Sequence, residues 1–107
     1  MQRRYFINRD VLISKKSLME ILKMCLLRGD SLFWIFTYWF EGNAIIIRSV
    51  DNVLVRLRRE ELMYSLRKLL EYFPHALHDG ELDGSLFSAD DADLVLQVAC
   101  FGRLIFD

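Results

Sequence analysis

The sequence is poor in the residues that break or cross-link a chain. Its 107 residues include one proline, five glycines and two cysteines. With 53% hydrophobic and 27% charged residues, this composition excludes a disordered or fibrous chain and indicates a compact globule. We expect one domain, residues 1–107, which is long enough to bury a core without disulfides or metals.

Signals for export and membrane insertion are also absent from the sequence. Cys25 and Cys100 both lie in apolar runs, which is typical of reduced, buried thiols and not of a secreted disulfide framework. The first ten residues, MQRRYFINRD, contain no apolar core of a secretory signal. The most apolar run, Leu32 to Phe40, is shorter than the roughly 20 residues needed to cross a bilayer. We therefore expect a cytoplasmic protein with no membrane contact.

What the sequence does contain is a concentration of β-branched and aromatic residues from Leu32 to Arg58. Two short segments suited to tight turns, Glu41-Gly42-Asn43 and Asp51-Asn52, divide it. After the second turn, apolar and arginine side chains alternate as in a half-buried strand. The pattern predicts a three-stranded antiparallel meander.

The first strand of this meander is apolar on both faces. Phe33, Ile35 and Trp39 share one face, and the other carries Leu32, Trp34, Phe36, Tyr38 and Phe40. Strands of this kind are usually covered on both sides, here by the N-terminal segment or the long loop. Otherwise the second face is an exposed aromatic patch, in which Trp34 and Tyr38 are candidate anchors for a partner.

A buried helix over Leu32 to Phe40 is the alternative, because a continuous apolar run has no diagnostic period. The resulting β–α–α–β–α–β order resembles barstar-type ribonuclease inhibitors, on the residues Thr37-Tyr38-Trp39-Phe40-Glu41 and Ile7-Asn8. We prefer the strand because of the aromatic and β-branched content.

Two helices flank the meander. The capping-box pair Ser17 and Glu20 predicts a helix that ends at Gly29, with Ser14 as an alternative start. The apolar spacing from Arg59 to Phe73 predicts the second helix, which Pro74 stops.

The remainder of the C-terminal region is predicted as a loop and two strands. Residues His75 to Asp93 have the composition of a long loop, Leu94 to Cys100 that of a strand, and Arg103 to Phe106 could return beside it. We therefore predict an α+β fold, with a single antiparallel β-sheet made of the central meander plus the C-terminal strands and two helices packed on it.

Charge is distributed unevenly along the chain. Residues 1–78 hold 13 Lys or Arg against 8 Asp or Glu, a net +5, whereas residues 79–107 hold one Arg against seven acids, a net −6. Acidic residues this close together suggest a surface that docks onto a basic protein, for instance onto the phosphate-binding groove of a nuclease. The alternatives are a solvated loop or acids paired with Arg56, Arg58 or Arg59. The candidate acidic residues are Asp79, Glu81, Asp83, Asp90, Asp91 and Asp93.

No catalytic, cofactor or metal site is predicted. The segment Asp79 to Asp90 partly matches an EF-hand loop, but Phe87 holds the ninth position and an Asp the twelfth. His75 and His78 match no zinc spacing. The basic residues near the start do not form a basic face with interleaved aromatics, and the pI of the chain is about 6.1, which argues against nucleic-acid binding. These basic residues are Arg3, Arg4, Arg9, Lys15 and Lys16.

As a whole, the chain resembles bacterial toxin-immunity proteins, including those of contact-dependent inhibition systems. The resemblance rests on the acidic LHDGELDGSLFSADDADL segment (Leu77 to Leu94) beside the predicted strand Val95 to Cys100, and it transfers no residue roles. It implies a non-enzymatic protein that binds one cognate toxin through its acidic surface. The alternative is a homodimeric interaction module, because the predicted element order also resembles type III secretion chaperones. The sequence leaves the oligomeric state open.

Overall fold

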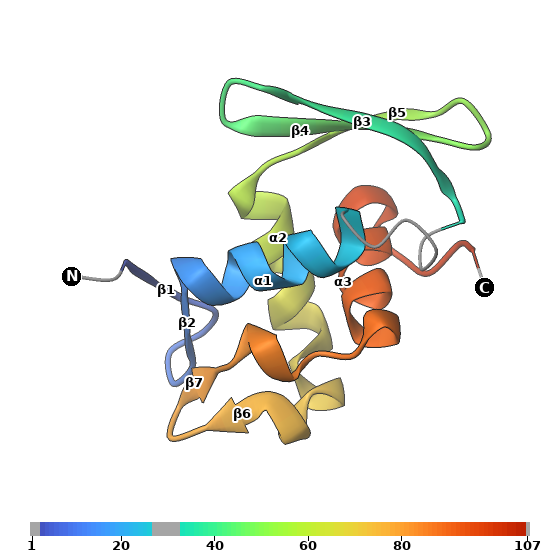
Figure 1. Cartoon of the computed structure of the whole chain (residues 1–107). Helices are drawn as coiled ribbons and strands as arrows, with labels where there is room; N and C mark the ends of the chain where they lie inside the picture. The colour runs from blue at the N-terminus through green and yellow to red at the C-terminus, as the bar shows by residue number, and fades with distance from the viewer. Residues whose placement is uncertain (1–2, 27–32, 107) are drawn as a thin grey trace.

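The computed structural model describes residues 3–26 and 33–106 (Figure 1). The fold is α+β, as predicted, but the described residues form two sheets and three helices in place of one sheet and two helices. In chain order the elements are β1 Arg4–Phe6, β2 Leu12–Ser14, α1 Lys15–Leu26, β3 Ile35–Glu41, β4 Ala44–Ser49, β5 Leu54–Leu57, α2 Arg59–Leu69, β6 Leu77–His78, β7 Glu81–Leu82 and α3 Ala89–Phe101, with short 3₁₀ turns at Leu70–Tyr72, Pro74–Ala76 and Gly84–Leu86.

The predicted meander is present as the sheet β3-β4-β5. Its first turn has a φ of +60° at Gly42 and no positive φ at Asn43, which is the pattern of a type II′ hairpin. The second turn uses the left-handed region at Asn52, with a φ of +64°. Residues Ile35 to Glu41 are therefore a strand, and the buried-helix alternative for this stretch is wrong.

A β-bulge between Ile35 and Thr37 changes the predicted faces of β3. Strict alternation would put Ile35 and Tyr38 on opposite faces, but the extra residue lets both pack against the core. Beyond the bulge, Tyr38 pairs with Ile47, which is fully buried. The inner face of the sheet consists of these residues together with Ile45, Val55 and Leu57.

The predicted C-terminal strand Leu94 to Cys100 is wrong, because this segment belongs to helix α3. Ser88 caps the helix by accepting the Asp91 N–H at 3.0 Å, and Gly102 ends it in the left-handed conformation. α3 contacts α1, α2 and β5, and a helix surrounded in this way is apolar on nearly all sides. Residues Arg103 to Phe106 are not a strand either.

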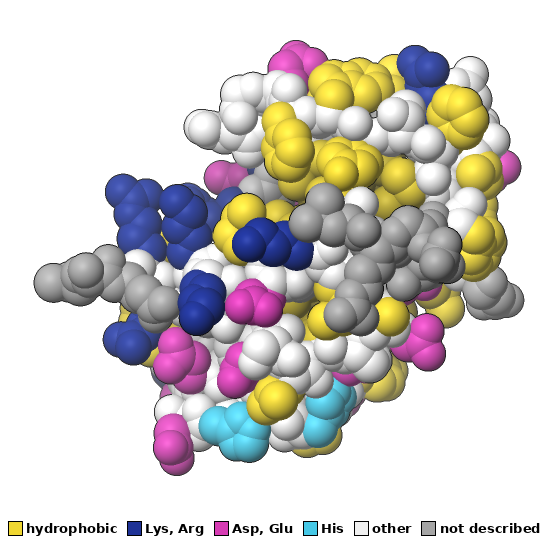
Figure 2. Space-filling view, in the orientation of Figure 1, with side chains coloured by type: hydrophobic (Ala, Val, Ile, Leu, Met, Phe, Trp, Pro, Cys, Tyr) yellow, Lys and Arg dark blue, Asp and Glu magenta, His cyan; other side chains and the backbone are white. Residues whose placement is uncertain are grey.

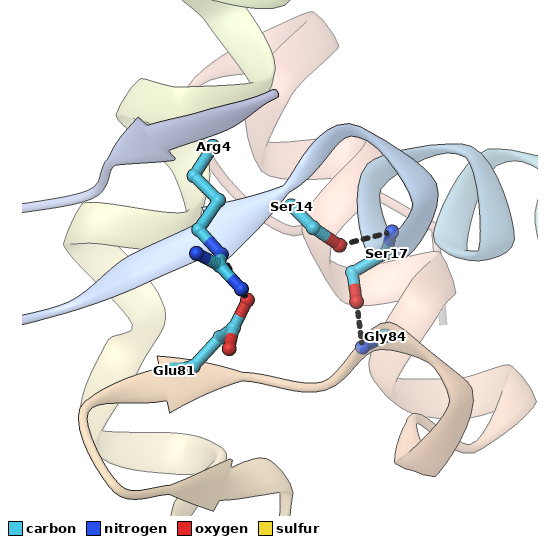
Figure 3. Close-up of polar contacts among 5 residues, drawn as sticks. All are labelled: Arg4, Ser14, Ser17, Glu81 and Gly84. Carbon is cyan, nitrogen blue, oxygen red and sulfur yellow. Dashed lines mark hydrogen bonds and ion pairs between the residues drawn. The ribbon is translucent and has the colours of Figure 1, made fainter. Parts of the chain in front are cut away.

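The first helix, α1, begins one turn earlier than Ser17 because Ser14 is its cap, accepting the Ser17 N–H at 3.0 Å. The Ser17 hydroxyl instead accepts the Gly84 N–H at 3.0 Å (Figure 3). The predicted helix end at Gly29 lies outside the described residues. α2 begins at Arg59 as predicted, and its last predicted turn is a 3₁₀ turn.

The predicted long loop over residues 75–93 is also wrong in part, because it contains the hairpin β6–β7. β7 pairs in parallel with β2, which gives a second small sheet of order β1-β2-β7-β6. The three helices lie between this sheet and the meander, and the main core fills the space under the meander (Figure 1). Within the described ranges, no helix combines the length and apolarity needed to cross a membrane.

Candidate interaction surfaces

Four of the six acidic residues singled out in the sequence make hydrogen bonds or ion pairs within the fold. Glu81 makes an exposed ion pair with Arg4, whose Nε lies 3.2 Å from the Glu81 carboxylate (Figure 3). The arginines proposed as alternative partners are engaged elsewhere: Arg56 pairs with Glu41, and Arg58 with Glu61. Three of the remaining acids, Asp83, Asp91 and Asp93, accept hydrogen bonds within the fold.

Asp93 and Trp34, both predicted to contact a partner, contact each other instead. The Trp34 indole N–H donates to Asp93 at 2.7 Å, and the Trp34 ring is 0% exposed, so it offers no surface for a partner. The ring also stacks on Phe106, with centroids 5.7 Å apart. The fully buried Gln97 donates to Asp93 at 3.1 Å, donates to the Phe106 carbonyl and accepts two backbone N–H groups of the C-terminal segment. This buried network joins the meander to α3 and the chain end.

Asp91 and Asp83 serve as local caps. Asp91 accepts the Ser88 N–H at 3.0 Å and lies 2.8 Å from His75 Nε2. Partial burial raises the pKa of Asp91, but hydrogen bonds from Ser88 and His75 outweigh it and hold the pKa below 3.8. Asp83 accepts both the backbone N–H and the hydroxyl of Ser85, which lowers its pKa in the same way.

Asp79 and Asp90 are the two acids of the set without a hydrogen bond or ion pair to the described residues. Asp79 lies in the β6–β7 turn with a φ of +51°, and Asp90 in the exposed first turn of α3. This hairpin and the 3₁₀ turn after it replace the twelve-residue loop of an EF-hand. In the described ranges no three His, Cys, Asp or Glu side chains converge as metal ligands.

Several exposed hydrophobic side chains lie on the meander. The helices cover only the inner face of this sheet, and hydrophobic side chains gather over its end of the molecule (Figures 1 and 2). Tyr38, the other predicted anchor, faces inward and is half-buried. The outer face exposes Leu54 at 55% and Trp39 at 38%; Phe36 in the bulge is 71% exposed, and Phe40, which is opposite Ile45 on the inner side near the hairpin end, is 68% exposed. An exposed apolar set of this kind is typical of an interaction surface.

The free edge of the same sheet lies along β3. The order β3-β4-β5 leaves β3 with β4 as its one partner among the described strands. Glu41 and Ala44 flank the two-residue hairpin turn and form its first hydrogen-bonded pair. Because hydrogen-bonded pairs alternate along an antiparallel ladder, the backbone groups of Trp39 and Thr37 also bond to β4. The backbone N–H and C=O of Tyr38 and Phe40 therefore point to the free edge.

Arg48 gives the outer face an unsatisfied donor. It lies in β4 opposite Thr37 and Leu54, and its Nε is buried without a hydrogen-bond partner in the described part of the chain. A buried guanidinium N–H without an acceptor is costly. Neither the β3 edge nor Arg48 was identified as a site from the sequence; the turn positions signalled the edge, but nothing in the sequence signalled the burial of Arg48.

Both cysteines are free thiols. Burial, together with the charges of Asp93 and Cys100, raises the pKa of Cys25, and burial with the charge of Glu61 raises the pKa of Cys100 to about 12. Both groups are therefore protonated at neutral pH and are weak nucleophiles.

Comparisons of this chain with protein-family models, curated proteins and solved structures found no match. The resemblance to toxin-immunity proteins thus stays a prediction from the sequence. The geometry on which a function can be argued is that of the chain itself: the β3 edge and the outer face of the meander.

Proposed function

We propose that this chain is a non-enzymatic protein-interaction domain that pairs with a second copy of itself through the free edge of β3. Two meanders joined at this edge form one continuous sheet, with the exposed rings of both copies along the junction. The observation that carries the proposal is a seven-residue edge strand with backbone groups that no other described strand pairs and with exposed Phe36, Trp39 and Phe40.

β3 lacks most of the devices by which monomeric proteins protect an edge strand. Such strands are usually short, charged, or interrupted by proline. β3 has neither lysine nor proline, and its one charged residue, Glu41, is at its end; its bulge lies near the other end, at Phe36. The opposite edge strand, β5, is four residues long and carries Arg56. The difference supports β3 as the edge that another strand covers.

The sequence of β3 also suits pairing with itself. In an antiparallel pair centred on Tyr38, Phe36 of one copy lies opposite Phe40 of the other. Glu41 lies opposite Ile35, so no like charges meet across the two-fold axis. Each cross-strand aromatic pair contributes roughly 0.2–1 kcal/mol beyond the backbone hydrogen bonds.

The proposal is tested by the mass of the full chain in solution, measured by light scattering after size-exclusion chromatography. We expect twice the 12.7 kDa chain mass at tens of micromolar. The double variant Phe36→Lys/Phe40→Lys places lysines opposite each other and is expected to be monomeric. Phe36→Glu/Phe40→Lys introduces charge at the same positions, but the opposite signs face each other, so the dimer is retained.

Circular dichroism of both double variants controls for folding, and Tyr72→Lys controls for loss of an exposed aromatic ring elsewhere. A monomeric wild-type chain at this concentration overturns the proposal. It is also overturned if the two folded double variants have the same mass, because pairing then does not depend on which charges meet.

The second candidate is neutralisation of a basic toxin, as the sequence resemblance implies. Asp79 and Asp90 favour it, because both are exposed and neither side chain makes a hydrogen bond or ion pair to the described residues. Asp79→Asn/Asp90→Asn should weaken capture of a basic partner and reduce its salt dependence without loss of fold. Unchanged capture and salt dependence would exclude this surface.

A further inference from the structure

The outer face of the meander is the side of the sheet that the helices leave uncovered (Figure 1). The register of the strands places the side chains of this face in rows across β3, β4 and β5. Arg48, in the central strand, lies directly opposite Leu54 and diagonally from Trp39. Such positions put the Cβ atoms about 5 Å and about 7 Å apart. Trp39, Arg48 and Leu54 therefore form a line across the sheet, with the cation between two apolar side chains.

The two apolar ends of this line are open to solvent. Leu54 is 55% exposed and Trp39 is 38% exposed. Ile46 lies opposite Trp39 in β4 and is buried, so it forms an apolar floor beside the arginine. The line is thus a surface that apolar groups of another molecule can cover.

Arg48 has no acidic partner in the described part of the chain. Its Nε is buried without a hydrogen-bond acceptor, and none of the ion pairs among the described residues includes it. Arg56, in the neighbouring row of the same face, is paired with Glu41, whose carboxylate lies 3.0 Å from its Nη2. Arg48 is only half-buried, so part of the residue remains accessible. The outer face therefore presents an uncompensated positive charge between Trp39 and Leu54.

We propose that this line binds an extended segment of a partner protein, in which a carboxylate has an apolar side chain two residues before it and another two residues after it. Alternate side chains of an extended chain share one face and are roughly 6.8 Å apart, which is close to the spacing along the line. The carboxylate pairs with Arg48, and the apolar side chains pack on Trp39 and Leu54. Apolar neighbours keep water away from such a pair and strengthen its charge-assisted hydrogen bonds. The line is separate from the free edge of β3, so the inference goes beyond the proposed function.

The test is an NMR titration of the isotope-labelled full chain with the blocked peptide acetyl-Leu-Thr-Glu-Thr-Leu-amide. We expect the largest shifts at the Arg48 Nε–H and the Trp39 indole N–H. The same peptide with Gln in place of Glu should bind about tenfold more weakly or less. Arg48→Gln should weaken binding of the Glu peptide by about the same factor. The matched control is Arg9→Gln, which removes the same charge from the exposed turn between β1 and β2, across the helices from the meander.

Four results would overturn the proposal. One is a Glu peptide that binds the wild-type chain no better than the Gln peptide at millimolar concentration, a comparison that needs no variant of the chain. Another is equal weakening by Arg48→Gln and Arg9→Gln, both folded by circular dichroism, which indicates general electrostatic attraction. The third is tighter binding of an oligothymidylate with shifts at Arg48 and Trp39, which indicates a surface for single-stranded nucleic acid. The fourth is a smaller solution mass of Arg48→Gln, which indicates that a second copy covers this face. The peptide comparisons hold whether or not β3 pairs at its edge, so the two proposals fail separately.

Discussion

Replacing Asp93 by alanine should destabilise the fold more than replacing any other acid of α3. Asp93 accepts hydrogen bonds from the Trp34 indole at 2.7 Å and from Gln97 at 3.1 Å. Gln97 keeps its hydrogen bond to the Phe106 carbonyl in the variant, but the fully buried indole N–H loses its acceptor. The sequence alone would have treated this residue as part of a docking surface.

The expected cost follows from these contacts. A hydrogen bond to a charged acceptor contributes about 1.5–3 kcal/mol, and a buried donor left unpaired costs about 1–3 kcal/mol. Because Asp93 is half-buried, water can partly replace the carboxylate. We therefore expect Asp93→Ala to lower the free energy of unfolding by about 2–4 kcal/mol. Asp90→Ala removes the same charge from the exposed first turn and should cost about 0.5 kcal/mol through the helix dipole.

Urea unfolding followed by circular dichroism measures both variants, at one protein concentration because dimerisation would shift apparent stability. Trp34→Phe, alone and with Asp93→Ala, completes a double-mutant cycle, in which the two costs should not add. The reasoning is refuted if Asp93→Ala lies within about 0.5 kcal/mol of the wild type, or if the two alanine variants are equally destabilised.

Two further predictions concern the contacts that join the second sheet and the 3₁₀ turns to the helices. A Cβ on Gly84 would lie 2.2 Å from the Ser17 carbonyl oxygen, so Gly84→Ala should lower the free energy of unfolding by about 2 kcal/mol or more; a variant as stable as the wild type in urea would contradict the close approach. The folded-state pKa of Asp91 lies below the unfolded value of 3.8, so its contribution is fully present above pH 3.8 and is lost as the pH falls through the folded-state pKa. The stability difference between the wild type and Asp91→Ala should therefore be larger at pH 6 than at pH 2.5, and a gap independent of pH would contradict it.

The sequence predicted the meander correctly because its turns carry their own chemistry. Gly42 and Asn52 occupy left-handed backbone regions that few other residues adopt. α2 was equally predictable, because its apolar spacing and the charges at its ends agree. In both cases the information is local and does not depend on distant contacts.

Helix α3 was predicted as a strand because burial on all sides removes the polar face that reveals a helix. A signal was nevertheless present. Ser88 with Asp91 is a capping box, and Gly102 lies at the spacing of a helix end. The aliphatic composition of Leu94 to Cys100 favours a strand, whereas these two end signals indicate the helix.

The acidic surface could not be judged from the sequence because spacing along the chain does not show which carboxylates the fold uses. Asp91 looked like a surface charge, but it is a capping residue, and the partner of Asp93 is 59 positions away. The bulge in β3 was equally hidden, since one extra residue reverses which side chains face the core.

Hydrogen exchange at the free edge of β3 tests the central proposal most directly. The amides of Tyr38 and Phe40 point away from β4, so in a monomer they exchange with solvent as an exposed loop amide such as that of Asn43 does. If two copies pair at this edge, both amides should be protected at tens of micromolar and lose protection on dilution. Rapid exchange of both amides at every concentration would contradict the pairing.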